Sequence, residues 1–147
     1  MGFIKVLKSS HDPVTLLLSL GKAMGYGVWL FYDNLVYLTK FKLIADGSAP
    51  RWDERAARFW FLGILCTLLM NIRTIVQNGI LNKPTPPSEY LQLVRNSLDL
   101  LVPATKLGMR PALLVAPNKG VVGLTGVVSS LISLYLLWPA RKTLPAK

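Results

Sequence analysis

The longest run of apolar positions predicts a membrane-spanning helix near the end of the chain. Residues 120–138 read GVVGLTGVVSSLISLYLLW and contain no charged side chain. At ~1.5 Å of rise per residue such a helix is about 28 Å long, close to the hydrocarbon thickness of a bilayer. Trp138 falls where an aromatic belt is expected, and Arg141 and Lys142 follow as basic interface anchors. The alternative, a buried helix of a soluble protein, is rarely apolar on all of its faces.

Small residues recur within this predicted span at intervals of four. Gly126 is followed by Ser130, and Ser129 by Ser133, a spacing that lets two helix backbones approach closely in lipid. The pattern predicts a surface for helix–helix contact or oligomerisation, the small-residue face, which consists of Gly123, Gly126, Ser129, Ser130 and Ser133. Packing against residues 59–76 of the same chain accounts for the pattern equally well, so both interpretations stay open.

A first long helix is predicted over residues 13–42. Asp12 is a favourable N-cap, and Pro13 suits the first helical position because its missing N–H costs nothing there. The first half of the helix is almost uncharged, whereas the second half mixes aromatic and charged side chains. Such a mixed face favours a helix that lies at the membrane interface or is half embedded, although a crossing by residues 13–32 is also compatible with the sequence. The predicted interface anchors of this helix are Trp29, Tyr32 and Tyr37.

A second helix is predicted over residues 53–78, after a loop at residues 45–52. Its uncharged core, residues 59–70, has twelve residues and is short for a span by itself. Arg73 follows this core and can extend its charged head to the interface. Two other roles for Arg73 stay open: it pairs with Asp33 or Asp99, or it lines a pore together with Asn71 and Asp99.

A third helix, over residues 89–102, is predicted to be amphipathic. Its apolar positions form one stripe, with polar residues opposite, and consist of Leu91, Val94, Leu98 and Leu101. Pro103 is expected to end or kink this helix, and residues 104–119 read as a connector. This helix and the helix over residues 13–42 are the candidate wedges, since an amphipathic helix inserted into one leaflet expands that leaflet.

Composition and charge place the chain among integral membrane proteins. Of the 147 residues 52% are hydrophobic and 16% charged, whereas soluble domains carry ~25% charged residues. We therefore predict an all-α membrane helical bundle in one domain, with one or two transmembrane helices and a third left open. The net charge of +10 favours anionic lipid head groups as partners. The sequence contains no recognition helix and no basic-aromatic stripe of the kind that binds nucleic acid. Positive-inside counting of the loops favours cytosolic termini.

Residues for catalysis or metal binding are scarce in this sequence. His11 is the single histidine and Cys66 the single cysteine, so a metal site of several His and Cys ligands cannot be built. The sequence contains no nucleophile motif of the G-x-S-x-G type and no phosphate-binding loop with its lysine. We predict a protein that is not an enzyme and that holds no cofactor.

Three blocks of residues carry a resemblance to a known family. They are, within the last span, Gly120, Gly123, Leu124, Gly126, Ser129, Ser130, Leu131, Ile132, Tyr135 and Trp138; within the first helix, Asp12, Pro13, Gly21, Gly25, Tyr26, Leu30, Asp33, Tyr37 and Leu38; and around the third helix, Asn96, Asp99, Pro103, Leu107 and Gly108. In this order they resemble the peroxin-11 family. Two departures stand out: only residues 1–10 correspond to the family's longer N-terminal region with its amphipathic helix, and Asn118 and Lys119 replace an acidic residue before the last span.

The resemblance implies a function in the peroxisomal membrane. A family member is expected to be a multi-pass protein there and to promote elongation, proliferation and division of peroxisomes by membrane remodelling and self-association. Its expected partners are further copies of itself, relatives from the same family and the fission machinery. The alternative function is a pore or transporter for anionic metabolites, lined by Asn71, Arg73 and Asp99.

Overall fold

The computed structural model describes residues 12–44, 49–109 and 119–138 of the 147-residue chain. Within these ranges the chain forms helices and no strand. The elements are, in order, α2 (Pro13–Lys40), α3 (Ala49–Ile80), α4 (Pro87–Lys106) and α5 (Lys119–Leu137). The all-α fold predicted from the sequence is confirmed.

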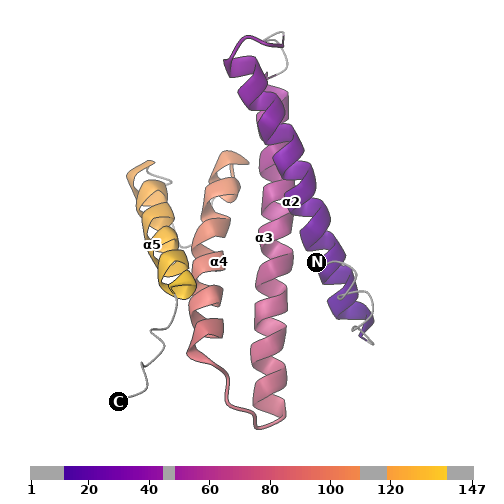
Figure 1. Ribbon diagram of the computed structural model, residues 1–147, viewed down its shortest axis with the longest axis vertical. Coiled ribbons are helices and arrows are strands. Elements are labelled where there is room, and N and C mark those ends of the chain that lie inside the picture. Colours follow the sequence, from indigo (N-terminus) through magenta and orange to yellow (C-terminus); the bar gives the residue numbers. More distant parts are fainter. Residues whose placement is uncertain (1–11, 45–48, 110–118, 139–147) are drawn as a thin grey trace, which may run out of the picture.

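The helices lie side by side in chain order, and each runs antiparallel to the one before (Figure 1). α3 packs between α2 and α4, and α4 packs between α3 and α5. Polar contacts between helix ends fix these directions. Asp12, at the start of α2, pairs with Arg73 near the end of α3, and Lys106, at the end of α4, pairs with Asp53 near the start of α3, with 2.9 Å between Nζ and Oδ1. Along the direction of the helix axes, the start of α2 and the end of α5 therefore lie at the same end of the bundle.

Helix α2 begins where the capping residues place it. The Asp12 carboxylate accepts hydrogen bonds from the backbone N–H of Val14 at 3.1 Å and from the Thr15 hydroxyl at 2.8 Å, and Pro13 follows it in the first turn. The helix ends at Lys40 rather than at residue 42. Lys42 has a φ of 57°, a left-handed conformation that residues other than glycine seldom adopt and that cannot continue a helix.

The start of α3 and the end of α4 differ most from the predicted boundaries. α3 begins at Ala49, so residues 49–52, predicted as loop, form its first turn. Pro50 is tolerated there because the first N–H groups of a helix have no helical partner. α4 continues through Pro103 to Lys106 instead of ending at the proline. The Pro103 carbonyl still accepts from the Leu107 N–H at 3.0 Å, so the proline removes one helical hydrogen bond without ending the helix.

Three of the described helices are long and apolar enough to cross a membrane. They are α2, α3 and α5, with mean hydropathies of 1.4, 1.8 and 1.9 over their most apolar windows. The crossing by α2 that the sequence left open thus meets the same criteria as the other two. The second half of α2 mixes aromatic side chains with Asp33 and Lys40, which is why the pattern suggested an interfacial helix.

Little of the apolar surface is buried inside the chain. Only 6% of the apolar window of α2, 22% of that of α3 and 11% of that of α5 is buried. Among the described residues, the buried hydrophobic side chains are mostly small, and they are Val36, Ala56, Ala57, Ile64, Cys66 and Ala104. Large apolar side chains such as Leu17 and Leu137 point outward. An arrangement with apolar groups outside is stable in lipid, where these groups lose nothing by exposure.

Candidate functional site

The contact between α2 and α3 is built on glycines. A Cβ atom at Gly25 would lie 2.5 Å from the backbone nitrogen and 2.6 Å from the Cα of Gly63, so the two backbones touch there. One turn earlier, a Cβ at Gly21 would lie 2.7 Å from the Cys66 sulfur. Gly21 and Gly25 form a small-xxx-small pair, and the sequence predicted that the glycines of this helix permit close packing. The partner, Gly63, could not be identified from α3 alone.

Aromatic rings continue this contact toward the end of α2. Trp29 stacks on Trp60 with 5.5 Å between ring centroids, and Tyr32 stacks on Phe59 at 6.1 Å. Trp29 and Tyr32 were predicted to anchor the helix at the interface, which stays a prediction, and in the structure their rings join α2 to α3. Tyr37, the third predicted anchor, is exposed, and the Lys40 amine lies 4.9 Å above its ring.

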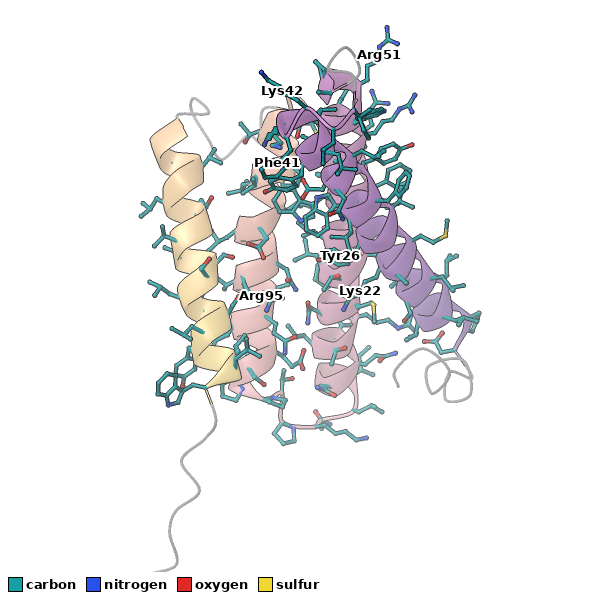
Figure 2. All side chains as sticks on the ribbon, turned by 45° about the horizontal axis from the view of Figure 1, so that its top comes forward. Lys22, Tyr26, Phe41, Lys42, Arg51 and Arg95 are labelled. Carbon is teal, nitrogen blue, oxygen red and sulfur yellow. The ribbon has the colours of Figure 1, made fainter. Side chains whose placement is uncertain are left out.

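Basic side chains gather at the end of the bundle where the chain passes from α2 to α3. Figure 2 shows Lys42, Arg51 and the exposed ring of Phe41 at this end of the molecule, away from Lys22. The exposed cations of this end that form no ion pair with a carboxylate of the described residues are Lys40, Lys42, Arg51 and Arg55. Such a combination of cations and apolar side chains suits the head-group layer of a membrane.

Arg73 pairs with Asp12, across the other end of the α2–α3 contact. The sequence had offered Asp33 or Asp99 as its partner, and both are wrong, because the antiparallel packing brings the end of α3 to the start of α2. The hydrogen bond from the Thr15 hydroxyl holds the pKa of Asp12 below its usual range, and the Val14 N–H and the Arg73 charge act in the same direction. The ion pair joins the start of α2 to the last part of α3.

A chain of polar side chains links α3, α4 and α5. We call it the polar seam, and it consists of Asn71, Glu89, Arg95, Asn96, Asp99 and Ser129. Asn71 of α3 accepts a hydrogen bond from the Asn96 amide at 2.6 Å and donates one to Glu89 at 3.2 Å. Asn96 is only 2% exposed. α4 is therefore joined to α3 by amide and carboxylate groups as well as by apolar packing.

The second half of the polar seam joins α4 to α5. The Ser129 hydroxyl donates to the carboxylate of Asp99, whose other oxygen lies 3.9 Å from Nε of Arg95. Arg95 also donates to the Asn96 side chain at 3.2 Å. Hydrogen bonds between helices are the usual way in which polar groups are accommodated inside a membrane. The amphipathic pattern of residues 89–102 predicted that this helix packs on something, and its polar residues bind both neighbours.

The three predicted pore-lining residues face different neighbours. Asn71 contacts α4, Arg73 contacts the start of α2, and Asp99 contacts α5. Within one chain Asn71 and Asp99 belong to the polar seam, whereas Arg73 lies at the contact with α2. Their role in a pore stays a prediction.

The small-residue face of α5 is divided by the fold. Ser129 is 5% exposed and bonds Asp99, and the Ser133 hydroxyl donates to the Ser129 carbonyl at 2.9 Å. A Cβ at Gly123 or at Gly126 would meet nothing within 4 Å, and Ser130 is exposed. α5 packs on α4 and not on residues 59–76 of α3, the alternative that the sequence suggested.

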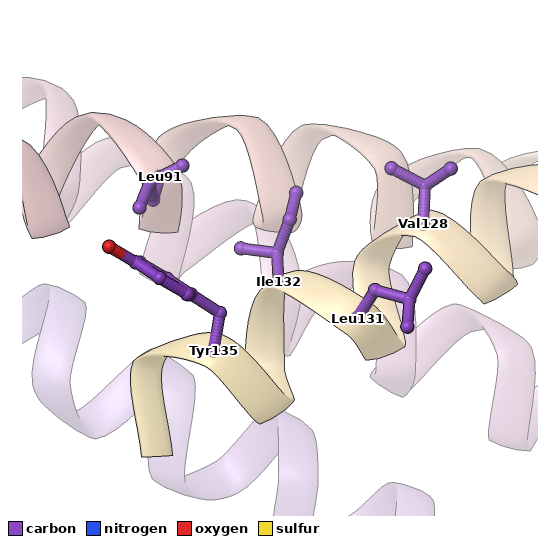
Figure 3. A pocket seen from close by; sticks show the side chains of 5 residues that line it. All are labelled: Leu91, Val128, Leu131, Ile132 and Tyr135. Carbon is purple, nitrogen blue, oxygen red and sulfur yellow. The ribbon is translucent and has the colours of Figure 1, made fainter. Parts of the chain in front are cut away.

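An apolar groove runs between α4 and α5 (Figure 3). Its volume is about 450 Å³, and it is lined by Leu91, Val128, Leu131, Ile132 and Tyr135. The groove is open along the outside of the two helices, in a region where α5 is apolar enough to lie in a membrane. The mainly apolar side chains that line the groove are therefore suited to contact with lipid acyl chains.

Several predicted residues lie at or beyond the ends of the described ranges. Trp138 is exposed directly after α5. His11, Arg141 and Lys142 lie outside the described residues. Within those ranges no three His, Cys, Asp or Glu side chains are grouped as metal ligands would be.

Comparison with known protein families shows to which family the chain belongs. The family described as peroxisomal biogenesis factor 11 (PEX11) matches residues 3–138, nearly the whole sequence. The chain belongs to the PEX11 family. This confirms the resemblance drawn from the glycine-rich last span, the first helix and the region around Pro103. The family consists of biogenesis factors of the peroxisome and supports a place for this member in the peroxisomal membrane.

Two curated relatives are peroxisomal membrane proteins of Candida boidinii. The chain is 21% identical to PMP30B and 22% identical to PMP30A, each over 82% of its own length. It spans about 60% of the length of these relatives. No solved structure matches the chain.

Proposed function

We propose that this PEX11-family member promotes the elongation, proliferation and division of peroxisomes by remodelling their membrane through self-association. The observation that carries the proposal is the family match over residues 3–138. The three helices that are apolar enough to span a membrane support an action inside the bilayer. The curated relatives support the organelle, because both are described as peroxisomal membrane proteins.

The lipid bilayer is the first proposed partner. α2, α3 and α5 present large apolar side chains outward, which favours contact with acyl chains. The cations Lys40, Lys42, Arg51 and Arg55 at the α2–α3 end favour anionic head groups, at ~1 kcal/mol for each charge near such a surface. Exposed Phe41 beside them suits the boundary between head groups and acyl chains.

The second proposed partner is another copy of the chain or a relative from the same family. Gly123, Gly126 and Ser130 share one side of α5, where a Cβ at either glycine would meet nothing within 4 Å and Ser130 is exposed. Because glycine and serine let two helices approach closely, the α5 helices of two copies fit together along this side. Ser129 and Ser133 are committed to contacts within the chain and contribute less. Recruitment of the fission machinery would follow from the same assembly.

Assembly explains remodelling better than insertion of a surface wedge. Both candidate wedges are packed along membrane-spanning neighbours: α2 is itself a candidate span, and α4 is bonded to α3 and α5. A row of helices that is repeated by self-association concentrates many copies in one region of the membrane, and the shape of the array then sets the shape of the membrane.

Imaging of peroxisomes tests this proposal. In cells that overproduce the fluorescently tagged chain, we expect peroxisomes to become longer or more numerous. Gly126→Leu should abolish this change while the protein remains on peroxisomes, because the leucine separates the α5 helices of two copies. Gly27→Leu is the matched control: a Cβ at Gly27 also meets nothing within 4 Å, but this glycine lies on α2.

The same cells provide a direct measure of assembly. Chemical cross-linking of isolated peroxisomes should yield dimers and larger species for the wild type and Gly27→Leu, and mainly monomer for Gly126→Leu. Unchanged peroxisome shape on overproduction of the wild type would refute the proposed function. Equal effects of both substitutions would refute the role of α5 and leave remodelling to another surface.

A further inference from the structure

We propose that α4 crosses the membrane as a fourth transmembrane helix, between α3 and α5, although its sequence is too polar to be recognised as a span. The inference rests on the direction of the helices, the depth of α4 relative to its neighbours, and the orientation of its polar side chains. It does not depend on the proposed function.

The direction of the helices requires the chain to return across the membrane. α3 and α5 are both candidate spans, and both run in the same direction within the row. Two successive spans in the same direction need a crossing between them. α4 runs antiparallel to both, and its 20 residues extend about 30 Å, the thickness of the hydrocarbon core. A helix is the form in which a single segment crosses lipid with its backbone groups paired.

Contacts along α4 place it at the depth of the two spans. Near one end Lys106 reaches Asp53 at 2.9 Å, and near the other Glu89 accepts from Asn71 at 3.2 Å. The uncharged core of α3, residues 59–70, lies between these two contacts. Asp99, in the second half of α4, is bonded to Ser129 at the middle of α5. α4 therefore lies alongside the apolar parts of both neighbours and not across their ends.

The polar side chains of Asn96 and Asp99 point from α4 toward its neighbours, whereas Tyr90 and Val94 point away from them. Asn96 and Asp99 bond α3 and α5, whereas Tyr90 and Val94 are 50% and 49% exposed. A helix lying on the membrane surface has the opposite arrangement, with its polar face in water. Glu89 and Lys106 lie in the first and last turns, close to the two membrane surfaces. The charges of Arg95 and Asp99, in between, face each other at 3.9 Å.

Single-cysteine labelling tests the crossing directly. In a Cys66→Ala background, cysteines are introduced one at a time as Leu43→Cys, Lys83→Cys and Met109→Cys, which are exposed positions after α2, α3 and α4. Each variant is treated with a membrane-impermeant maleimide in intact peroxisomes, in permeabilised peroxisomes, and in denaturing detergent to define full labelling. The Leu43–Lys83 pair serves as the control for the crossing by α3.

Four crossings predict that Leu43→Cys and Met109→Cys label under the same condition and Lys83→Cys under the other. At the position on the outer surface, labelling in intact organelles should reach the full value, and at the enclosed position it should rise at least several-fold on permeabilisation. If Lys83→Cys and Met109→Cys label alike while Leu43→Cys differs, α4 does not cross and the proposal is overturned. Identical labelling of all three positions would also overturn it, since α3 would not cross either.

Discussion

At the scale of residues, glycines and one ion pair determine how α2 meets α3. Gly25 and Gly63 bring the two backbones into contact, and the pairing of Asp12 with Arg73 fastens the start of α2 to the end of α3. The sequence showed that Gly21 and Gly25 were spaced for close packing and that Asp12 was a cap. It could not show the partners, because Gly63 and Arg73 are distant along the chain and neither has a local pattern that points to α2.

A side chain at Gly25 should separate the two helices. In Gly25→Leu the new Cβ would lie 2.5 Å from the Gly63 nitrogen, a backbone atom that cannot move away without shifting α3. Overpacking of this kind costs about 1–3 kcal/mol, so we expect a lower midpoint of thermal unfolding in detergent micelles. Gly27→Leu, on the same helix but with open space around it, should unfold close to the wild type. Equal midpoints for the two variants would contradict the backbone contact.

Asp12 should make stability depend on pH. Its pKa is lowered from the ordinary value of 3.8, first by the Thr15 hydrogen bond and further by Val14 and Arg73. A carboxylate with a lowered pKa in the folded state stabilises the fold above its unfolded pKa and loses this contribution as the pH falls through the folded value. We expect thermal stability to drop below about pH 4 and this step to be smaller in Asp12→Asn. Thr15→Val should reduce the step as well, whereas an unaltered pH profile in both variants would contradict the cap.

At the scale of elements, α4 differs most from its expected role. The sequence correctly indicated a helix with a polar and an apolar face, since that periodicity is local. It did not reveal that the polar face packs inward, against Asn71 and Ser129, because hydrophobic periodicity does not identify the medium on either side of a helix. Pro103 was expected to end or kink the helix, yet α4 continues one turn further to Lys106. Pro103 lacks the N–H that would bond the Asp99 carbonyl, but its own carbonyl still accepts from the Leu107 N–H, so the last turn forms after it.

Removing the buried amide of α4 should loosen its contact with α3. Asn96→Ala deletes the hydrogen bond to Asn71 and the acceptor of Arg95, at 2.6 Å and 3.2 Å. Hydrogen bonds between membrane helices contribute about 0.6 kcal/mol on average and up to about 1.7 kcal/mol, and we expect a loss of this size. Ser97→Ala is the neighbouring control, because the Ser97 hydroxyl is exposed and bonds only the Leu93 carbonyl of its own helix.

A double-mutant cycle with Asn71→Ala separates the pair from other effects of substitution. The losses in unfolding free energy caused by Asn71→Ala and by Asn96→Ala should together exceed the loss in the double variant, because each single change removes the same hydrogen bond. Simple additivity would show that the two amides contribute independently and would contradict their coupling across the helices.

At the scale of the whole molecule, the chain is an open row with polar groups inside and apolar groups outside. α2, α3 and α5 expose most of their apolar surface, while the polar seam lies between α3, α4 and α5. The apolar groove between α4 and α5 opens outward as well. This arrangement is the reverse of a water-soluble fold, and it requires a bilayer or further copies of the chain to cover the apolar faces. In the proposed assembly, the open space at Gly123 and Gly126 is where such copies would fit most closely.

The sequence by itself determined the helical composition, the membrane environment and the family. Apolar runs, the N-cap at Asp12, the scarcity of charge and the glycine-rich last span are all local or additive properties, so they can be counted without knowing the fold. Tertiary structure alone decided which residues meet: Gly25 with Gly63, Arg73 with Asp12, and Asp99 with Ser129. These pairings depend on the antiparallel order and relative depth of four helices. In a membrane, where apolar surface does not drive helices together, small residues and hydrogen bonds set that order.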